Sequence, residues 1–182
     1  GAPDSNVEFA LQIFSGLLVF GLFSEIVGRS ANLIVEQPNL VKKVIFPLEI
    51  LPWVSTLSAL FFSSASFLVL LAGLLLMRDG ITIHILSVPL IVAVFIPLLL
   101  GLGWLLASLG VYLRDISHIV SIILAPMLFL SPIFYPVTSM PEFAQSLMLF
   151  NPLTIIIEAF RAATLEASWP DFAMLFKYFL VS

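Results

Sequence analysis

Asp115 and His118 are the one pair of neighbouring side chains in this sequence whose types suit acid–base chemistry. The sequence contains no G-x-x-x-x-G-K-[ST] loop for ATP phosphates, no G-x-S-x-G nucleophile motif and no H-E-x-x-H zinc motif. It also contains no cysteine, so no thiolate metal site is possible and no metal is expected on this chain. An enzyme is therefore the least favoured function, and loss of both side chains without effect would exclude it.

The composition points to lipid as the solvent of this chain. Of its 182 residues, 61% are hydrophobic and 10% are charged, whereas soluble proteins are roughly half apolar and about a quarter charged. So few charges cannot cover a surface that faces water. The formal net charge of −4 leaves no basic patch for nucleic acid. Nearly every charge lies at the end of an apolar segment, so buried ionisable groups that could act as catalysts within the membrane are not expected. If the chain carries out energy-requiring work, another subunit must supply the energy.

The apolar segments predict an all-α integral membrane protein. Membrane-spanning helices are expected over residues 7–26, 51–77, 83–113 and 116–135, and an incomplete one over 172–182. The runs are continuously apolar rather than alternating, which favours helices over barrel strands.

Small residues recur at helical spacing in two of these segments and predict close helix packing. They are Ser55, Ala59, Ser63 and Ser66 in the second, and Gly103, Ala107 and Gly110 in the third. Bundle packing is favoured here over the lining of a pore. In the third segment, Pro89 is expected near the helix start and Pro97 at a kink.

Lysine and arginine predict the orientation, because they gather on the cytoplasmic side. The first and third loops hold Arg29, Lys42, Lys43 and Arg114, whereas the others hold Arg78 and Arg161. We therefore expect the N-terminus outside, residues 28–50 and the turn at 114–115 in the cytoplasm, and residues 136–170 outside.

Residues 136–170 do not form a span and predict two short helices. Ser139 and Glu142 fit a capping box at the start of the first. Asn151 and Pro152 supply an N-cap and a first-turn proline for the second.

Glu158 and Arg161 stand three residues apart in the second short helix, so they could pair on one helix face. The two short helices are too apolar for a solvated loop, and a buried, re-entrant or interfacial pair fits. An interfacial anchor and a lid over an external pore exit are both open at this point.

Four stretches carry a resemblance to a known family. "NLIVEQPNLVKKVIFPLEILP", "YLRDI", "FLSPIFYPVTSMP" and "NPLTIIIEAFR" occur in this order, and with their spacing the chain resembles ABC-2-type transporter permeases. It is most similar to the polysaccharide-export branch, which moves O-antigen, capsular polysaccharide or teichoic acid. The match covers roughly residues 14–180.

The resemblance implies the transmembrane domain of a type V-like exporter. Such a permease pairs with a second copy and with two nucleotide-binding subunits, which bind the ATP and magnesium, so this chain needs no cofactor of its own. It moves a lipid-linked glycan and is embedded in the lipids of the cytoplasmic (inner) membrane. The family has six spans, and the first has no counterpart here, while the last is unfinished.

In this resemblance, residues 28–50 form a coupling segment that contacts the ATPase subunit. The residues implied are Asn32, Glu36, Gln37, Lys42, Lys43, Phe46 and Pro47. An ordinary basic anchor at the membrane surface is the alternative. Arg114 and Asp115 offer a second cytoplasmic contact or a charged turn that ends a helix.

Aromatic residues and the short helices supply the remaining candidates. Aromatic faces suit sugar rings, and the candidates for a channel lining are Trp104, Phe129, Phe134 and Tyr135. The alternative is a belt of aromatic residues at the lipid headgroups. The resemblance places Asn151, Pro152, Glu158 and Arg161 in an external gate.

The function expected is the permease subunit of an ATP-driven exporter of a lipid-linked polysaccharide. An ABC-2 exporter of a drug or small lipid is the first alternative, because one fold serves several functions. A membrane scaffold subunit without transport is the second, and it predicts no ATPase partner.

Overall fold

The computed structural model describes residues 5–37, 47–77, 82–113, 115–134, 148 and 151–182. The regular structure in these ranges is helical, which confirms the predicted all-α class. The helices are α1 (Ser5–Ser30), α3 (Ile50–Met77), the 3-10 helix η1 (Ile83–Ser87), α4 (Val88–Tyr112), α5 (Ile116–Leu130), α7 (Pro152–Thr164) and α8 (Phe172–Val181).

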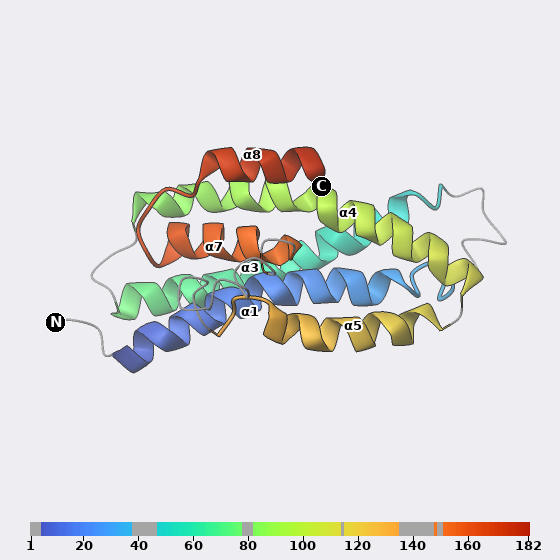
Figure 1. Ribbon diagram of the computed structural model, residues 1–182, viewed down its shortest axis with the longest axis horizontal. Coiled ribbons are helices and arrows are strands. Elements are labelled where there is room, and N and C mark those ends of the chain that lie inside the picture. Colours follow the sequence, from blue (N-terminus) through green and yellow to red (C-terminus); the bar gives the residue numbers. More distant parts are fainter. Residues whose placement is uncertain (1–4, 38–46, 78–81, 114, 135–147, 149–150) are drawn as a thin grey trace.

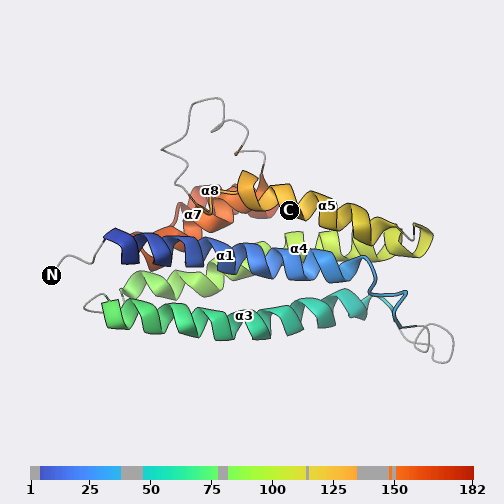
Figure 2. The same cartoon turned by 90° about the horizontal axis from the view of Figure 1, so that it is seen from below.

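Three long helices, α1, α3 and α4, lie side by side along the bundle (Figure 1). α1 contacts all of α3, α4, α5 and α7. Figures 1 and 2 show that α5 covers the half of the bundle where α1 ends, whereas α7 and α8 cover the half where α1 begins. We call these halves the Ser30 end and the Ser5 end.

Helix length separates these elements into two kinds. The windows Asn6–Ser30, Ile50–Leu76 and Ile83–Tyr112 are long and apolar enough to cross a membrane, and they coincide with the first three predicted spans. α5 has 15 residues and α8 has 10, against the roughly 20 that a span requires. α5 ends at Leu130, before the end of the segment predicted to span from 116 to 135. Ser131 is extended there, as expected for a residue that precedes a proline.

The centre of the bundle is a packed apolar core between α1 and α4. The rings of Phe23 and Phe95 stack with centroids 6.5 Å apart, and Ile26, Ile91 and Leu99 around them are buried. Much of α3 points outward instead, and Phe61 is 74% exposed. An outward apolar face is what a lipid-facing helix requires.

The two prolines of α4 have the predicted positions. Pro89 lies in the first turn, where its missing N–H leaves no helical hydrogen bond unmade. Pro97 lies inside the helix, and Figure 1 shows that α4 changes direction part-way along its length. A proline inside a helix removes one backbone hydrogen bond and commonly causes such a bend.

The small residues of α4 allow the backbone of this helix to touch its neighbours. Gly103, Ala107 and Gly110 are all buried. A Cβ on Gly103 would lie 3.4 Å from Pro52 Cβ, and one on Gly110 would overlap the carbonyl oxygen of Ala31. The predicted close packing is thus confirmed for α4. On α3 it holds for Ser55 and Ala59, which are buried, whereas Ser66 is exposed.

We predict that Gly110→Ala lowers the thermal stability of the protein in detergent. The new methyl group would meet backbone atoms of Ala31, which cannot rotate away, and such overpacking costs about 1–3 kcal/mol. Gly101→Ala on the same helix is the matched control, because no atom lies within 4 Å of its Cβ position. It should leave the melting temperature equal or raise it, since alanine favours helices. Equal shifts for both variants would contradict this packing contact.

Candidate functional site

The first residues of the predicted coupling segment (28–50) leave α1 through a series of turns at the Ser30 end. The Asn32 N–H donates to Arg29 O at 3.2 Å, and the Glu36 N–H donates to Asn32 O at 2.9 Å. Glu36 is exposed, whereas Asn32 and Gln37 are partly buried. Among these three predicted coupling residues, Glu36 is therefore the most accessible to a partner.

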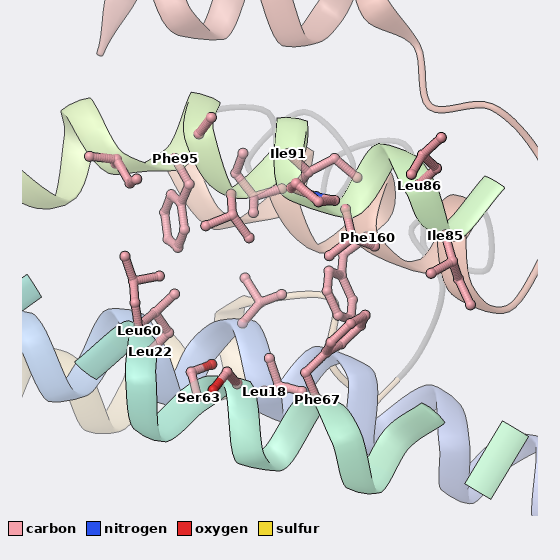
Figure 3. A pocket seen from close by; sticks show the side chains of 18 residues that line it. Leu18, Leu22, Leu60, Ser63, Phe67, Ile85, Leu86, Ile91, Phe95 and Phe160 are labelled. Atoms are coloured by element: carbon pink, nitrogen blue, oxygen red, sulfur yellow. The ribbon is translucent and has the colours of Figure 1, made fainter. Parts of the chain in front are cut away.

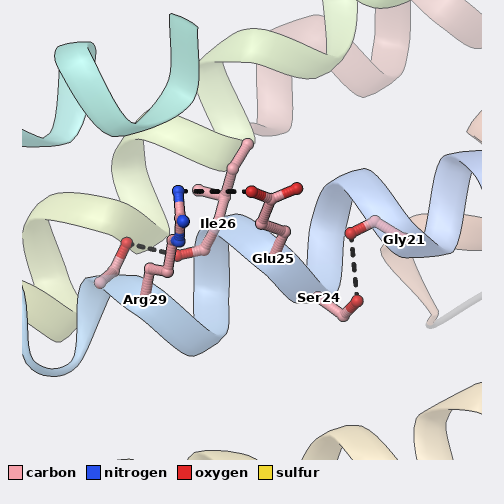
Figure 4. Close-up of polar contacts among 6 residues, drawn as sticks. Gly21, Ser24, Glu25, Ile26 and Arg29 are labelled. Carbon is pink, nitrogen blue, oxygen red and sulfur yellow. Dashed lines mark hydrogen bonds and ion pairs between the residues drawn. The ribbon is translucent and has the colours of Figure 1, made fainter. Parts of the chain in front are cut away.

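At the end of α1, one ion pair and one hydroxyl hydrogen bond each join residues one turn apart in the same helix. Arg29 Nη1 lies 3.3 Å from Glu25 Oε1, one turn earlier (Figure 4). Ser30 Oγ donates to Ile26 O at 2.6 Å. An exposed ion pair of this kind adds little stability, so its chief effect is to hold the Arg29 side chain along the helix surface.

The described part of the segment continues at Pro47. The Ile50 N–H donates to Pro47 O at 3.1 Å, and this turn leads directly into α3. The predicted contacts Lys42, Lys43 and Phe46 lie outside the described residues, and so does Arg114 of the second predicted contact. Its neighbour Asp115 is exposed before the first turn of α5.

α4 contacts the segment at both of its ends. Gly110 lies against the Ala31 carbonyl at the start. Near the other end, Trp104 Nε1 donates to Glu49 O at 3.0 Å. The Trp104 ring also meets the Trp53 ring edge to face, with centroids 6.4 Å apart. α4 therefore touches the chain at Ala31, just after α1, and at Glu49, just before α3.

Trp104 was predicted from the sequence as a channel residue, but no local pattern indicated its bond to Glu49. The two residues are 55 positions apart. The ring is 42% exposed, so part of its surface stays open toward lipid or a partner. The lining role stays a prediction.

The end of α5 and the start of α7 lie next to each other, and we call this place the α5–α7 break. Asn151 caps α7, because its Oδ1 accepts from the Leu153 N–H at 3.0 Å. The predicted N-cap and the first-turn Pro152 are both confirmed. Asn151 Nδ2 also donates to Leu130 O at 3.2 Å and to Ser131 Oγ at 3.0 Å. One side chain therefore caps the start of α7 and satisfies a carbonyl at the end of α5.

Arg161 binds the backbone on the far side of the same break. Its Nη2 donates to Ile133 O at 2.5 Å and to Gln12 O at 3.3 Å. The residue is 4% exposed. A side chain on Gly16 would come within 3.1 Å of that Nη2. Arg161 thus joins α7 to α1 and to the chain that follows α5.

Glu158 and Arg161 form no direct ion pair, although the sequence predicts that they could pair on one helix face. The Arg29–Glu25 pair is the one ion pair found within the described ranges. Partial burial raises the pKa of the Glu158 carboxyl, while the Arg161 guanidinium lowers it and Glu166 raises it further. Arg161 influences Glu158 through space but gives its hydrogen bonds to backbone carbonyls.

Two of the predicted channel aromatics meet beside the same break. The rings of Phe129 and Phe134 stack with centroids 5.9 Å apart and an interplanar angle of 23°. Phe129 is 64% exposed, whereas Phe134 packs partly against the core. Tyr135 lies outside the described residues, as do Ser139 and Glu142 of the predicted capping box.

An apolar cavity of about 540 Å³ lies between the helices at the Ser5 end. Figure 3 shows that α1 and α3 face α4 and α7 across it, through side chains such as Leu22, Phe67, Phe95 and Phe160. The Phe67 and Phe160 rings meet at 5.9 Å on its wall. Its lining offers almost no hydrogen-bonding groups, so it suits an apolar molecule. The sequence analysis did not predict it, because it is formed by residues from five elements.

The polar pair considered for acid–base chemistry lies at the start of α5. Asp115 and His118 are both exposed, and the contact between them is a backbone hydrogen bond from the His118 N–H to Asp115 O at 3.1 Å. Among the described residues, no group of three or more His, Asp or Glu side chains is placed to hold a metal ion.

Comparison with known proteins agrees with this architecture. The model of the ABC-2 type transporter family matches residues 3–165. The chain is similar to the O-antigen export system permease protein RfbA of Myxococcus xanthus, with 32% identity over 90% of this chain and 64% of that protein. It is 26% identical to the polysialic acid transport protein KpsM of Escherichia coli, over 90% of this chain and 63% of that protein.

A second O-antigen export permease, RfbA of Klebsiella pneumoniae, is 24% identical over 85% of this chain and 60% of its own length. The chain therefore spans slightly less than two thirds of the length of these relatives. The family match nevertheless covers most of the chain, and the long apolar helices agree with it. The resemblance noted in the sequence is thus confirmed: this chain is a multi-pass membrane protein that belongs to the ABC-2 type transporter family.

Proposed function

We propose that this chain is the permease part of an ATP-driven exporter that moves a lipid-linked polysaccharide across the cytoplasmic membrane. The observation that carries this proposal is its similarity, over 90% of its length, to permeases named for O-antigen export and polysialic acid transport. In this view the chain is a transport subunit. Two nucleotide-binding subunits bind ATP and magnesium and carry out the hydrolysis.

The geometry of the Ser30 end suits a coupling role. Exposed Glu36, with Asn32 and Gln37 beside it, offers polar contacts to an ATPase subunit. Lys42, Lys43, Phe46 and Pro47 complete the proposed contact surface, with Arg114 and Asp115 as a second one. Movement of this surface on ATP binding would pass to α4 through Gly110 and Trp104, which touch its two ends.

A hydrophilic polymer cannot cross hydrocarbon unaided, because each unpaired polar group costs several kcal/mol. We propose that two copies of the permease enclose the path. The stacked Phe129 and Phe134 rings, together with Tyr135 and Trp104, are our candidates for its aromatic lining, because flat apolar faces accept varied sugar rings. Asn151, Pro152, Glu158 and Arg161 then belong to the gate on the outer side.

A second candidate function is the export of a drug or small lipid. The apolar cavity of Figure 3 favours it, because about 540 Å³ lined by aliphatic and aromatic side chains fits a small apolar molecule better than a sugar polymer.

We predict that cells lacking the permease accumulate lipid-linked polymer on the inner face of their cytoplasmic membrane. The polymer is made inside, and without a channel its hydroxyl groups prevent crossing. Fractionation and labelling of surface glycan in deleted and complemented strains measure this. A deleted strain with normal surface glycan and raised sensitivity to apolar drugs would instead support the second candidate.

We predict that Trp104→Phe reduces permease-stimulated ATPase activity and transport about fivefold, as expected for one lost hydrogen bond. The phenyl ring keeps most of the packing but cannot donate to Glu49 O. Trp53→Phe is the control, because the Trp53 indole N–H makes no hydrogen bond within the described part of the chain. Full activity of Trp104→Phe in the assembled transporter would rule out this route of coupling.

We predict that the Ser30 end faces the cytoplasm. The 182 residues contain no cysteine, so single substitutions give unambiguous labelling. A thiol from Gln37→Cys should react with an impermeant maleimide after the cells are opened, and one from Asn6→Cys should react in intact cells. The reverse pattern would place the coupling segment outside and refute the proposed contact with the ATPase.

A further inference from the structure

Arg161 has more hydrogen-bonding capacity than its backbone contacts use. Only Nη2 bonds to carbonyl oxygens, at Gln12 and Ile133. Its Nε is buried and has no hydrogen-bond partner among the described residues. The whole residue is only 4% exposed. Glu158 and Glu166 act on this guanidinium through space, but neither forms an ion pair with it. Burying such a charge is costly in a protein interior. Such a group calls for an explanation beyond the packing of α7.

Arg161 lines two polar hollows. The first, of about 300 Å³, lies between α7, α1 and the start of α8 and is lined by Gln12, Glu158, Glu166 and Asp171 among others. The second, of about 360 Å³, adds Glu8 from α1 and Ala167 from the turn after α7. Arg161, Gln12 and Glu166 line both. The two polar hollows are therefore neighbours that share one buried cation, and neither shares a lining residue with the apolar cavity.

The chemistry of this surface selects among possible ligands. Three carboxylates, those of Glu158, Glu166 and Asp171, line the first hollow together with the Arg161 guanidinium. An anion would meet a net negative field, and a metal cation would meet the guanidinium without a cluster of ligands to hold it. Hydroxyl groups both donate and accept hydrogen bonds. A neutral polyhydroxyl molecule can therefore give its protons to the carboxylates and accept from Arg161 and the Gln12 amide.

We propose that the polar hollows around Arg161 bind an uncharged sugar unit of the exported polymer and discriminate against a polyanionic one. This inference rests on the proposed export of polysaccharide and narrows its substrate class. The site lies at the Ser5 end, beside the α5–α7 break. A sugar bound there contacts the residue that ties α7 to α1, so binding and the position of α7 are linked.

The test uses the full permease with its ATPase subunits in lipid nanodiscs and two probes, a neutral maltooligosaccharide and an oligosialic acid of equal length. Binding is measured by saturation-transfer NMR. Glu166→Gln and Glu158→Gln remove charge and weaken acceptors while keeping side-chain shape. Each should weaken binding of the neutral probe about tenfold, as expected when a hydroxyl loses a charged partner. The same variants should strengthen binding of the anionic probe.

Opposite effects on the two probes separate recognition from structural damage, because a misfolded site would lose both. Glu25→Gln is the matched control, since it removes a carboxylate at the Ser30 end and should change neither. The proposal is overturned if the unaltered permease does not bind the neutral probe, or if the Gln variants shift both probes in the same direction.

The two experiments distinguish an incorrect site proposal from an incorrect proposal of polysaccharide export. If deleted cells trap polymer but the purified permease ignores maltooligosaccharide, export stands and the site proposal falls. If binding follows the predicted charge dependence while deleted cells trap no polymer, the site stands and polysaccharide export falls.

Discussion

The structure depends on the need of every backbone amide and carbonyl to find a partner where water is absent. In hydrocarbon a helix meets this need by itself, which explains the three long helices. At the α5–α7 break, where α5 ends at Leu130, side chains take over this task. There, Asn151 donates to Leu130 O and Arg161 donates to Ile133 O. Two side chains of α7 thus supply the donors that a continuous helix would have supplied.

A second constraint is the close approach of helices that have no hydrophobic force between them in lipid. Glycines on α4 meet it, and they bring that helix against the start of the coupling segment. The Trp104 hydrogen bond to Glu49 O brings the same helix against the other end. α4 is therefore both a closely packed helix of the bundle and the helix that touches the two ends of the proposed coupling segment. This joins stability to the proposed transmission of force.

The bundle holds two kinds of hollow, and together they match the two parts of the proposed lipid-linked substrate. The apolar cavity between α1, α3, α4 and α7 has the character of lipid. The polar hollows around Arg161 have mixed donors and acceptors. Both involve α7 and the Ser5 end of the bundle, so one short helix separates an apolar environment from a polar one.

The sequence by itself determined the helical class, the three long spans, the cap of α7 by Asn151 and Pro152, and the packing of Gly103 and Gly110. These features depend on composition, on helical spacing and on neighbouring residues. The tertiary structure decided that α5 ends at Leu130, that Trp104 binds Glu49, and that Arg161 bonds to Gln12, 149 positions away, instead of pairing with Glu158. Such contacts join residues whose distance along the chain carries no periodic signal, so only the packed bundle brings them together.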